Sequence, residues 1–261
     1  MKIATFNVNS VKARLEGVLA WVKEAAPDVA ALQELKCETD AFPHQPFEDL
    51  GYTCEVLGQK TYNGVALVSK YPLEDVLLGL PGGFEDAQAR YLEATVAPKG
   101  ARPLRIAALY LPNGNPPDTE KFTYKLAWME RLYARAQTLL VSEEAFALCG
   151  DYNVIPTADD VWDELAMAAD ALARPESRRA FRKLLHLGLT DAFRACDARP
   201  HQYTFWDYQA GAYPKNHGFR IDHLLLSPQA ADRLVSAGID AHVRGWERPS
   251  DHVPVGCEIA P

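Results

Sequence analysis

Short runs of apolar residues alternate with polar segments along most of the chain, and their lengths are typical of strands. Three longer segments instead repeat apolar residues at helical spacing, which predicts helices over 11–22, 118–141 and about 176–187. The strands are predicted at residues 2–6, 29–32, 53–57, 65–69, 91–97, 104–111, 145–149, 203–207, 220–227, 239–243 and 253–259.

Many of these strands follow one another without a helix between them, so a doubly wound parallel sheet fits the order poorly. Two packed sheets with helices on the outside fit it better. The chain contains no short repeat, low-complexity tract or flexible linker, and its Pro and Gly residues are scattered. We therefore expect a single α/β domain over residues 1–261.

Polar residues cluster where the apolar strands begin or end. A carboxylate beside buried strand residues is unfavourable by several kcal/mol unless it is paired or holds a metal. Carboxylate, amide and imidazole groups that converge without cysteine predict a site for Mg²⁺ or Mn²⁺ rather than for structural zinc. Four segments carry these groups: Gln33-Glu34, Gly150-Asp151-Tyr152-Asn153, Arg220-Ile221-Asp222 and Ser250-Asp251-His252.

Composition narrows the class of protein. Of the 261 residues, 48% are hydrophobic and 24% charged, which is typical of a globular protein. No apolar run reaches the ~18 residues of a membrane span, and the first residues lack the pattern of a signal peptide. The five cysteines form no CxxC motif, which favours free thiols in a reducing compartment. We therefore expect a cytoplasmic protein with no membrane partner.

The net charge of −8 argues against a broad nucleic-acid interface, whose footprint is usually basic. That argument weakens if several carboxylates hold a cation, because the cation inverts the local field. One stretch, residues 174–183, carries five positive charges and one negative. It is either an edge that faces DNA or a solvated helix face.

A set of short motifs resembles the exonuclease III type of AP endonuclease, within the endonuclease/exonuclease/phosphatase family that includes DNase I. The motifs occur in family order from residue 6 to residue 255, and the complete set is far more specific than any one member. They are Phe6-Asn7-Val8-Asn9, Leu32-Gln33-Glu34-Leu35-Lys36, Asn63-Gly64-Val65-Ala66, Tyr110-Leu111-Pro112-Asn113-Gly114, Gly150-Asp151-Tyr152-Asn153, Leu189-Thr190-Asp191-Ala192-Phe193-Arg194, Arg220-Ile221-Asp222-His223-Leu224-Leu225 and Ser250-Asp251-His252-Val253-Pro254-Val255.

The resemblance implies a DNase I-like, four-layer α/β sandwich of two packed mixed β-sheets flanked by helices, with the active site at one edge of the sheets. It implies that Glu34 is the main Mg²⁺ ligand, with Mn²⁺ able to substitute. Asp151 would orient or deprotonate the attacking water, and Asp222 would orient His252. The metal set that the resemblance implies is Asn7, Glu34, Asp151, Asn153, Asp251 and His252.

Other roles implied by the resemblance concern the substrate. His252 would contact the scissile phosphate or transfer a proton, and Tyr110 would assist the leaving group or the phosphate. Asn113 and Asn153 would hold the phosphate. Phe205 and Trp206 lie where family members carry aromatics that line a pocket for a baseless sugar, although aromatic strand residues are equally common in cores.

The function that the resemblance implies is a Mg²⁺-dependent DNA repair phosphodiesterase. It would cut 5′ to abasic sites and trim or clean 3′ ends, acting as a monomer on duplex DNA with abasic sites, nicks or blocked 3′ ends. Two alternatives stay open: a phosphatase or phosphodiesterase of small or lipid phosphates, and a non-catalytic nucleic-acid-binding regulator on the same fold. Asn9 stands where many eukaryotic relatives have Asp, which leaves the number of metal carboxylates open.

Overall fold

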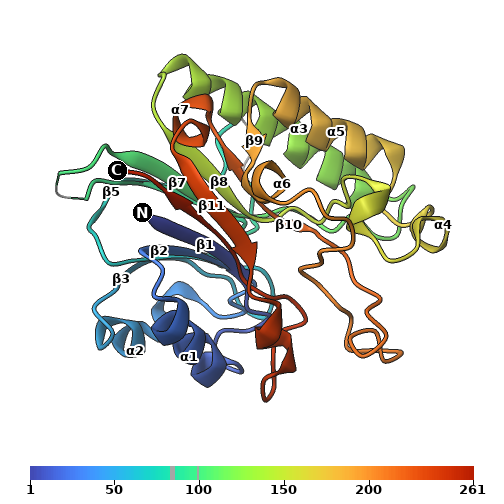
Figure 1. The fold of residues 1–261 in the computed structure, drawn as a ribbon, viewed down its shortest axis with the longest axis horizontal. Coiled ribbons are helices and arrows are strands. Elements are labelled where there is room, and N and C mark those ends of the chain that lie inside the picture. Colours follow the sequence, from blue (N-terminus) through green and yellow to red (C-terminus); the bar gives the residue numbers. More distant parts are fainter. Residues whose placement is uncertain (83–85, 99) are drawn as a thin grey trace.

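The strands form two six-stranded mixed sheets that pack face to face in the computed structural model, which describes residues 1–82, 86–98 and 100–261 (Figure 1). The first sheet has the order β11-β12-β1-β2-β4-β3 and the second β5-β6-β7-β8-β10-β9. The strands are β1 Lys2–Asn7, β2 Val29–Gln33, β3 Thr53–Leu57, β4 Val65–Ser69, β5 Leu73–Leu78, β6 Tyr91–Val96, β7 Leu104–Tyr110, β8 Phe146–Asp151, β9 Thr190–Asp191, β10 Asp222–Leu226, β11 Leu234–Ile239 and β12 Val255–Ile259.

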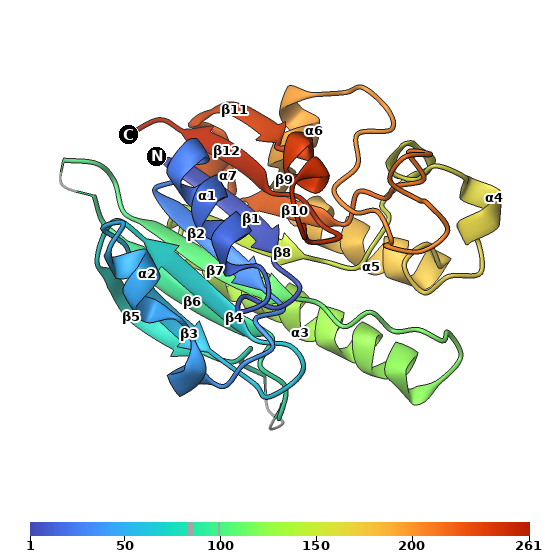
Figure 2. The ribbon, with the colours of Figure 1, turned by 90° about the horizontal axis from the view of Figure 1, so that it is seen from below.

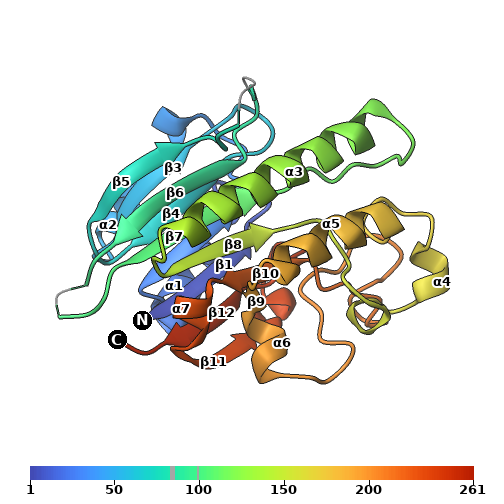
Figure 3. The same ribbon diagram turned by 90° about the horizontal axis from the view of Figure 1, so that it is seen from above.

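Helices cover the outer face of each sheet, as Figures 2 and 3 show from opposite sides. The first sheet carries α1 (Leu15–Ala25) and α2 (His44–Glu48), and the second carries α3 (Glu120–Val141) and α5 (Pro175–His186). The remaining helical segments are shorter: α4 Glu164–Met167, α6 Ala192–Cys196, α7 Pro228–Ala231, and 3-10 turns η1 Thr39–Ala41, η2 Ala158–Asp160 and η3 Ala241–Gly245.

Three layers of apolar side chains explain why the central strands are buried on both faces. Alternate strand residues such as Ile3 and Leu224 fill the space between the sheets. On the outer faces, Phe6 packs in the cluster that contains Trp21 of α1, and Leu148 in the cluster that contains Trp128 of α3. Successive strand side chains point to opposite faces, so each central strand needs apolar residues at nearly every position. The expected four-layer α/β sandwich is confirmed.

The topology brings several strand ends to one edge of the molecule. β1 runs parallel to β2, and β7 runs parallel to β8, so in each sheet two carboxyl ends lie side by side. β10 runs antiparallel to β8 with Asp222 opposite Asp151, which puts the start of β10 at that same edge. The two chain termini lie at the other end of the sheets (Figure 1).

Two predicted strands are wrong. In residues 203–207, Phe205 forms isolated β-bridges, but no continuous β-ladder follows. The neighbouring Trp206 N–H donates instead to Asp251 O, which lies in a loop. Residues 239–243 lie mostly in the η3 turn, and the strand precedes them at Leu234–Ile239. The edge strand β5 was not predicted, because Glu74 and Asp75 interrupt its apolar residues, and most of the strand is exposed. No helix in the described part of the chain is long and apolar enough to span a membrane.

A buried ion network holds the loop before β10 against its neighbours. The Arg220 guanidinium, only 1% exposed, donates from Nε to Asp160 Oδ1 at 2.7 Å and from Nη1 to Asp191 Oδ2 at 2.8 Å. Burial opposes ionisation of Asp191, but Arg220 and His223 outweigh it and lower the pKa of this carboxyl. His223 thus belongs to this network, on the opposite face of β10 from Asp222.

The network predicts an acid-sensitive contribution to stability. The Asp191→Asn variant should lose about 3 kcal/mol of unfolding free energy at pH 7, because it leaves a buried guanidinium short of a charged partner. The folded-state pKa of Asp191 lies below the unfolded value of about 3.9, so its contribution is complete above about pH 5 and disappears as the pH falls. Urea unfolding between pH 3 and pH 7 measures this.

The variant should therefore show a shallower fall of stability on acidification than the wild type. The exposed Asp232→Asn substitution serves as the matched control and should follow the wild-type curve. Parallel curves for the wild type and Asp191→Asn would show that the network does not carry this charge-dependent stability.

Candidate active site

One amide joins the two sheets at the shared edge. Asn7 ends β1, Glu34 follows β2 directly, and Asp151 ends β8. The Nδ2 group of Asn7 donates to Glu34 Oε1 and to Asp151 Oδ2, each at 2.9 Å. The carboxylates of the two sheets therefore converge on one side chain that is itself fully buried.

The backbone at this edge adopts conformations that most residues avoid. Glu34 has a φ of +52° and Asn153 a φ of +47°, both in the left-handed region. Asn tolerates this region well, but Glu does so at a cost. The turn after β2 is held by Ser10 N, which donates to Glu34 O at 2.7 Å. Such enforced strain is typical of functional sites, where the surrounding structure fixes a side chain in place.

Three groups at this edge are arranged as metal ligands could be. One ligand atom each from Glu34, Asp151 and His252 lies within 4.8 Å of the other two. Within the described ranges, these three form the group of His, Cys, Asp or Glu side chains that is close enough together to hold a metal ion. Carboxylate oxygens beside an amide suit a hard divalent cation. The Lys36 ammonium lies 2.9 Å from Glu34 Oε2, so the same carboxylate already attracts a cation.

The charges of this cluster depend on one another. Burial raises the pKa of Asp151, and the nearby carboxylates of Asp222 and Glu34 raise it further against the opposing effect of His252. Burial also acts against ionisation of Glu34, but the Lys36 charge and the Asn7 hydrogen bond hold the pKa of that carboxyl below its usual range. The two metal-binding candidates therefore differ in how readily they take a proton.

Asp222 and His252 form a buried pair. His252 Nδ1 lies 2.9 Å from Asp222 Oδ2, and Thr204 Oγ1 donates to the same carboxylate at 2.6 Å. The other imidazole nitrogen, Nε2, lies 3.7 Å from Asp151 Oδ2. Burial disfavours the imidazolium, but Asp222 and Asp151 outweigh burial and raise the pKa of His252 well above its ordinary value. The ring is thus oriented by Asp222, and its Nε2 faces Asp151.

Two asparagines lie beside this cluster with their amides joined. Asn113 Nδ2 donates to Asn153 Oδ1 at 3.1 Å, and Asn153 Nδ2 donates to Leu111 O at 2.9 Å. Behind them Lys125, which is fully buried, donates from Nζ to the backbone carbonyls of both asparagines. Burial lowers the pKa of Lys125 to about 7, while Asp151 and Asp170 act in the opposite direction.

Tyr110 and Asp251 reach the cluster through different residues. The phenol of Tyr110, the last residue of β7, lies within hydrogen-bonding reach of Glu34, and its pKa is raised well above the usual value by burial and by Glu34 and Asp151. Asp251 contacts the cluster through Asn9, whose Nδ2 donates to Asp251 Oδ1 at 2.9 Å. Lys36 in turn donates to Asn9 Oδ1.

The two predicted aromatic residues face different surroundings. The Phe205 ring lies 4.9 Å from the His252 ring and stacks on Phe219 at 5.5 Å, so it borders the cluster. Trp206 is instead buried in the core beside α1, where its indole N–H donates to Asn216 Oδ1 at 3.1 Å. Of the two rings, only that of Phe205 borders the cluster, whereas Trp206 reaches Asp251 only through its backbone N–H.

The basic stretch 174–183 is largely engaged within the protein. Three of its cations form ion pairs with neighbouring segments: Arg174 with Asp118, Arg178 with Glu164, and Lys183 with Glu130. The other two, Arg179 and Arg182, are exposed on α5. This pattern favours the interpretation as a solvated helix face.

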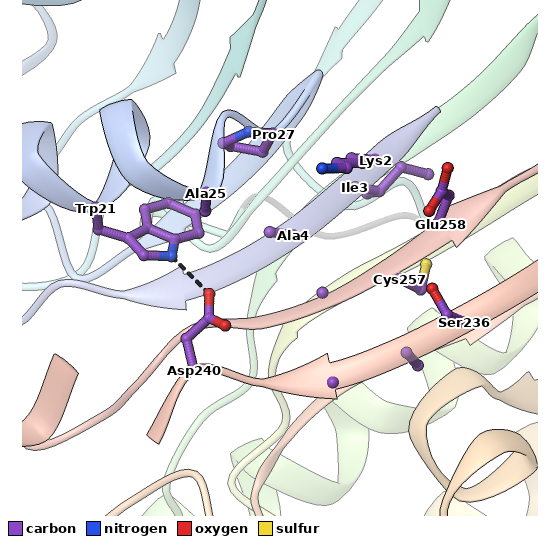
Figure 4. Close-up of a pocket in the computed structure, with 13 residues that line it drawn as sticks. Lys2, Ile3, Ala4, Trp21, Ala25, Pro27, Ser236, Asp240, Cys257 and Glu258 are labelled. Atoms are coloured by element: carbon purple, nitrogen blue, oxygen red, sulfur yellow. Dashed lines mark hydrogen bonds between the residues drawn. The ribbon is translucent and has the colours of Figure 1, made fainter. Parts of the chain in front are cut away.

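A separate hollow of about 250 Å³ lies on the outer face of the first sheet (Figure 4). Trp21 of α1 forms one wall, and its indole donates to Asp240 at 2.8 Å. The floor includes Ala4, Gly238 and Gly256, and none of the predicted site residues lines it. We assign it no role in the chemistry of the site.

The sequence did not single out Thr204, which bonds to Asp222, or Phe219, which stacks on Phe205. Its pattern suggests that Lys125 is either solvated or in contact with phosphate, but the side chain is fully buried and supports the two asparagines. Lys36 stood within a quoted motif but had no assigned role. A lysine on an amphipathic helix is typical of a solvated position, so only the structure distinguishes Lys125 from Lys121, its exposed neighbour one turn earlier.

Comparison with known proteins agrees with this geometry. Residues 4–252 match the family model described as "Endonuclease/Exonuclease/phosphatase family". Two packed mixed sheets with an acidic cluster and an Asp–His pair at their shared edge are the features of this class of metal-dependent hydrolase. The chain belongs to the endonuclease/exonuclease/phosphatase family.

Three relatives are similar over nearly their whole lengths. Exodeoxyribonuclease III of Haemophilus influenzae is 34% identical, and the alignment covers 99% of this chain and 100% of the relative. An AP endonuclease from Archaeoglobus fulgidus is 37% identical, with a TM-score of 0.93 and 99% of both chains covered. The 3′ phosphatase NExo from Neisseria, in a structure bound to product DNA hairpin, is 37% identical, with a TM-score of 0.94 and 100% of both chains covered.

The Asp222–His252 pair predicts a measurable titration. In protein kept free of metal by a chelator, the His252 imidazole should titrate well above pH 6.5, because Asp222 and Asp151 stabilise its charged form. The Asp222→Asn variant should titrate at a clearly lower pH, whereas the exposed Asp232→Asn control should match the wild type. NMR of the His252 ring protons follows both titrations, and an unchanged titration in Asp222→Asn would contradict the pairing.

Proposed function

We propose that this chain is a Mg²⁺-dependent DNA repair phosphodiesterase of the exodeoxyribonuclease III type. It cuts duplex DNA 5′ to abasic sites and removes nucleotides or blocking groups from 3′ ends. The observation that carries the proposal is the buried convergence of Asn7, Glu34, Asp151 and His252, with Asp222 behind the imidazole, at one edge of the paired sheets. The full-length relatives with exodeoxyribonuclease III, AP endonuclease and 3′ phosphatase names support the same substrate class.

In this proposal Glu34 and Asp151 hold the metal, with the amide of Asn7 between them. A bound Mg²⁺ supplies positive charge to the phosphoryl oxygens as negative charge develops on them. Mn²⁺ takes the same oxygen-rich ligands and would substitute. Asp251, which reaches the cluster through Asn9, is assigned to an alternative metal position together with Asn153 and His252.

In the proposed reaction, Asp151 acts as the general base and Tyr110 as the general acid. Asp151 takes a proton from water while the water oxygen attacks phosphorus. The P–O3′ bond breaks as the new bond forms. The phenol of Tyr110 is protonated at neutral pH and gives its proton to the leaving 3′ oxygen as that bond breaks. The imidazolium of His252 and the amides of Asn113 and Asn153 stabilise the phosphoryl group.

Local features favour DNA as the substrate despite the net charge of −8. Lys12, Arg14 and Arg248 line a hollow of about 520 Å³ together with Glu16 and Glu247, so its lining has three positive and two negative charges, a net charge of +1. Arg14 connects this basic surface to the site, because its Nε donates to Pro249 O at 3.1 Å, next to the motif that carries Asp251. A basic surface beside a metal site suits a polyanionic backbone that extends beyond the reacting phosphate.

The aromatic wall formed by Phe205 and Phe219 suits a sugar that has lost its base. Phe205 stacks on Phe219 and borders the His252 ring, and an abasic residue that turns out of the duplex could pack against these rings. Free cysteines, three of them buried, fit a reducing cytoplasm, where the protein would act as a monomer on duplex DNA with abasic sites, nicks or blocked 3′ ends.

The direct test is cleavage of labelled duplexes that contain one abasic site, one nick or one 3′-phosphate, with Mg²⁺ and with chelator. The wild type should cut 5′ to the abasic site only when the cation is present. Glu34→Gln should lower the rate on the order of 10³-fold, because it removes a metal-binding charge, with partial recovery at high Mg²⁺. The exposed Glu38→Gln variant, four residues away, should keep the wild-type rate.

Other outcomes would select the alternatives. Tight binding of the abasic duplex with no cleavage under any divalent cation would favour a non-catalytic regulator. Turnover of a small phosphate ester in preference to DNA would favour a family phosphatase. A Glu34→Gln protein with wild-type activity at low Mg²⁺ would overturn the metal assignment.

A further inference from the structure

The side chain of Lys125 is the least expected feature near the site. It lies in the first half of α3 and is 0% exposed, whereas lysine side chains in proteins are almost never fully buried unless they are paired. Burial of an ammonium is unfavourable unless hydrogen bonds replace its water. Its Nζ donates to Asn153 O at 2.5 Å and to Asn113 O at 3.0 Å. Because it has no exposed surface, Lys125 cannot itself contact DNA.

The two carbonyls that Lys125 binds belong to the two residues whose side-chain amides are joined. Asn113 lies in the loop between β7 and α3, and Asn153 lies in the loop after β8, so the ammonium connects two loops from neighbouring parallel strands. Asn153 holds a left-handed conformation with a φ of +47°. A backbone of this kind stays in place only when its surroundings enforce it.

The aliphatic part of Lys125 supports the same loop. A Cβ at Gly114, whose φ is +86°, would lie 2.6 Å from Lys125 Cδ, so the loop backbone rests directly on the lysine stem. The ammonium is also attracted by Asp151, and by Asp170, which accepts a hydrogen bond from Asn115 Nδ2 at 3.1 Å. Charge, hydrogen bonds and packing therefore all tie Lys125 to the loops that carry the asparagine amides.

We propose that Lys125 is a positioning residue that holds the backbones of Asn113 and Asn153 so that their amides meet the reacting phosphoryl group in a fixed orientation. It acts through the asparagines and not on the substrate. The inference rests on the proposed function and deepens it. It gives a role to Lys125, which takes no part in the proposed metal binding or proton transfers.

The test is a double-mutant cycle with Asn153→Ala. Lys125→Met keeps the stem length but removes the ammonium, and it should lower kcat about 100-fold, because a small misplacement of groups at the phosphate has that effect. KM should change by less than about threefold, since the other DNA contacts remain. In the Asn153→Ala background the same substitution should lower kcat by less than about threefold.

Arg135→Met is the matched control. Arg135 lies on the same helix and is also mostly buried, but its guanidinium pairs with Glu93 on the outer face of the second sheet. The Arg135→Met variant should unfold at a lower temperature than the wild type. At temperatures where the variant is folded, it should keep the wild-type kcat. All rates are compared at a temperature where thermal unfolding shows each variant to be native.

A readout without activity separates positioning from general damage. In metal-free protein, the side-chain amide resonances of Asn113 and Asn153 should shift or broaden in Lys125→Met and stay in place in Arg135→Met. Lys125→Gln, which keeps amide N–H donors on a shorter side chain, should recover part of the lost kcat. If Lys125→Met does not fold, Lys125→Gln takes its place in the cycle with the same expected non-additivity.

Fully additive losses in the cycle, or unchanged asparagine resonances in Lys125→Met, would overturn the inference. Equal losses of kcat in Lys125→Met and Arg135→Met would overturn it as well. These outcomes are distinct from failure of the proposed function, which would appear as a wild-type protein that does not cut the abasic duplex. The resonance experiment tests the positioning role in that case too.

Discussion

The structure depends on the confinement of negative charge at the edge where two sheets meet. The carboxylates of Asp151 and Asp222 are fully buried there and that of Glu34 is partly buried, and such groups are strongly unfavourable without compensation. Two basic side chains compensate them: Lys36 pairs with Glu34, and the His252 ring pairs with Asp222 and faces Asp151. Lys125 lies behind the cluster and binds the backbone carbonyls of Asn113 and Asn153. In the proposed function, a metal ion held by Glu34 and Asp151 would complete this balance of charge.

The two sheets provide this confinement because each brings parallel carboxyl ends to the shared edge. Asn7 and Glu34 come from the first sheet, whereas Tyr110 and Asp151 come from the second. The antiparallel pairing of Asp222 with Asp151 adds the group that orients His252. The proposed metal ligands are therefore divided between the two sheets, so the proposed site requires the complete sandwich.

Much of this could be predicted from the sequence, because an isolated polar residue at the end of an apolar strand has a clear physical meaning. That pattern marked Glu34, Asp151 and Asp222, and the paired sheets followed from strands joined without helices. The apolar segment 203–207 misled the prediction, since a strand pattern does not reveal whether a partner strand exists. Lys125 could not be predicted, because helical spacing does not show that its ammonium lies beneath two loop carbonyls.

The central claim is that this buried charge is organised around a divalent cation held by both sheets. The most direct measurement is a crystal structure of the protein soaked in Mn²⁺, with the ion located by its anomalous scattering. The account predicts one principal peak within bonding distance of carboxylate oxygens from both Glu34 and Asp151. A principal peak that contacts neither carboxylate, or a cluster that stays free of metal at saturating Mn²⁺, would contradict it.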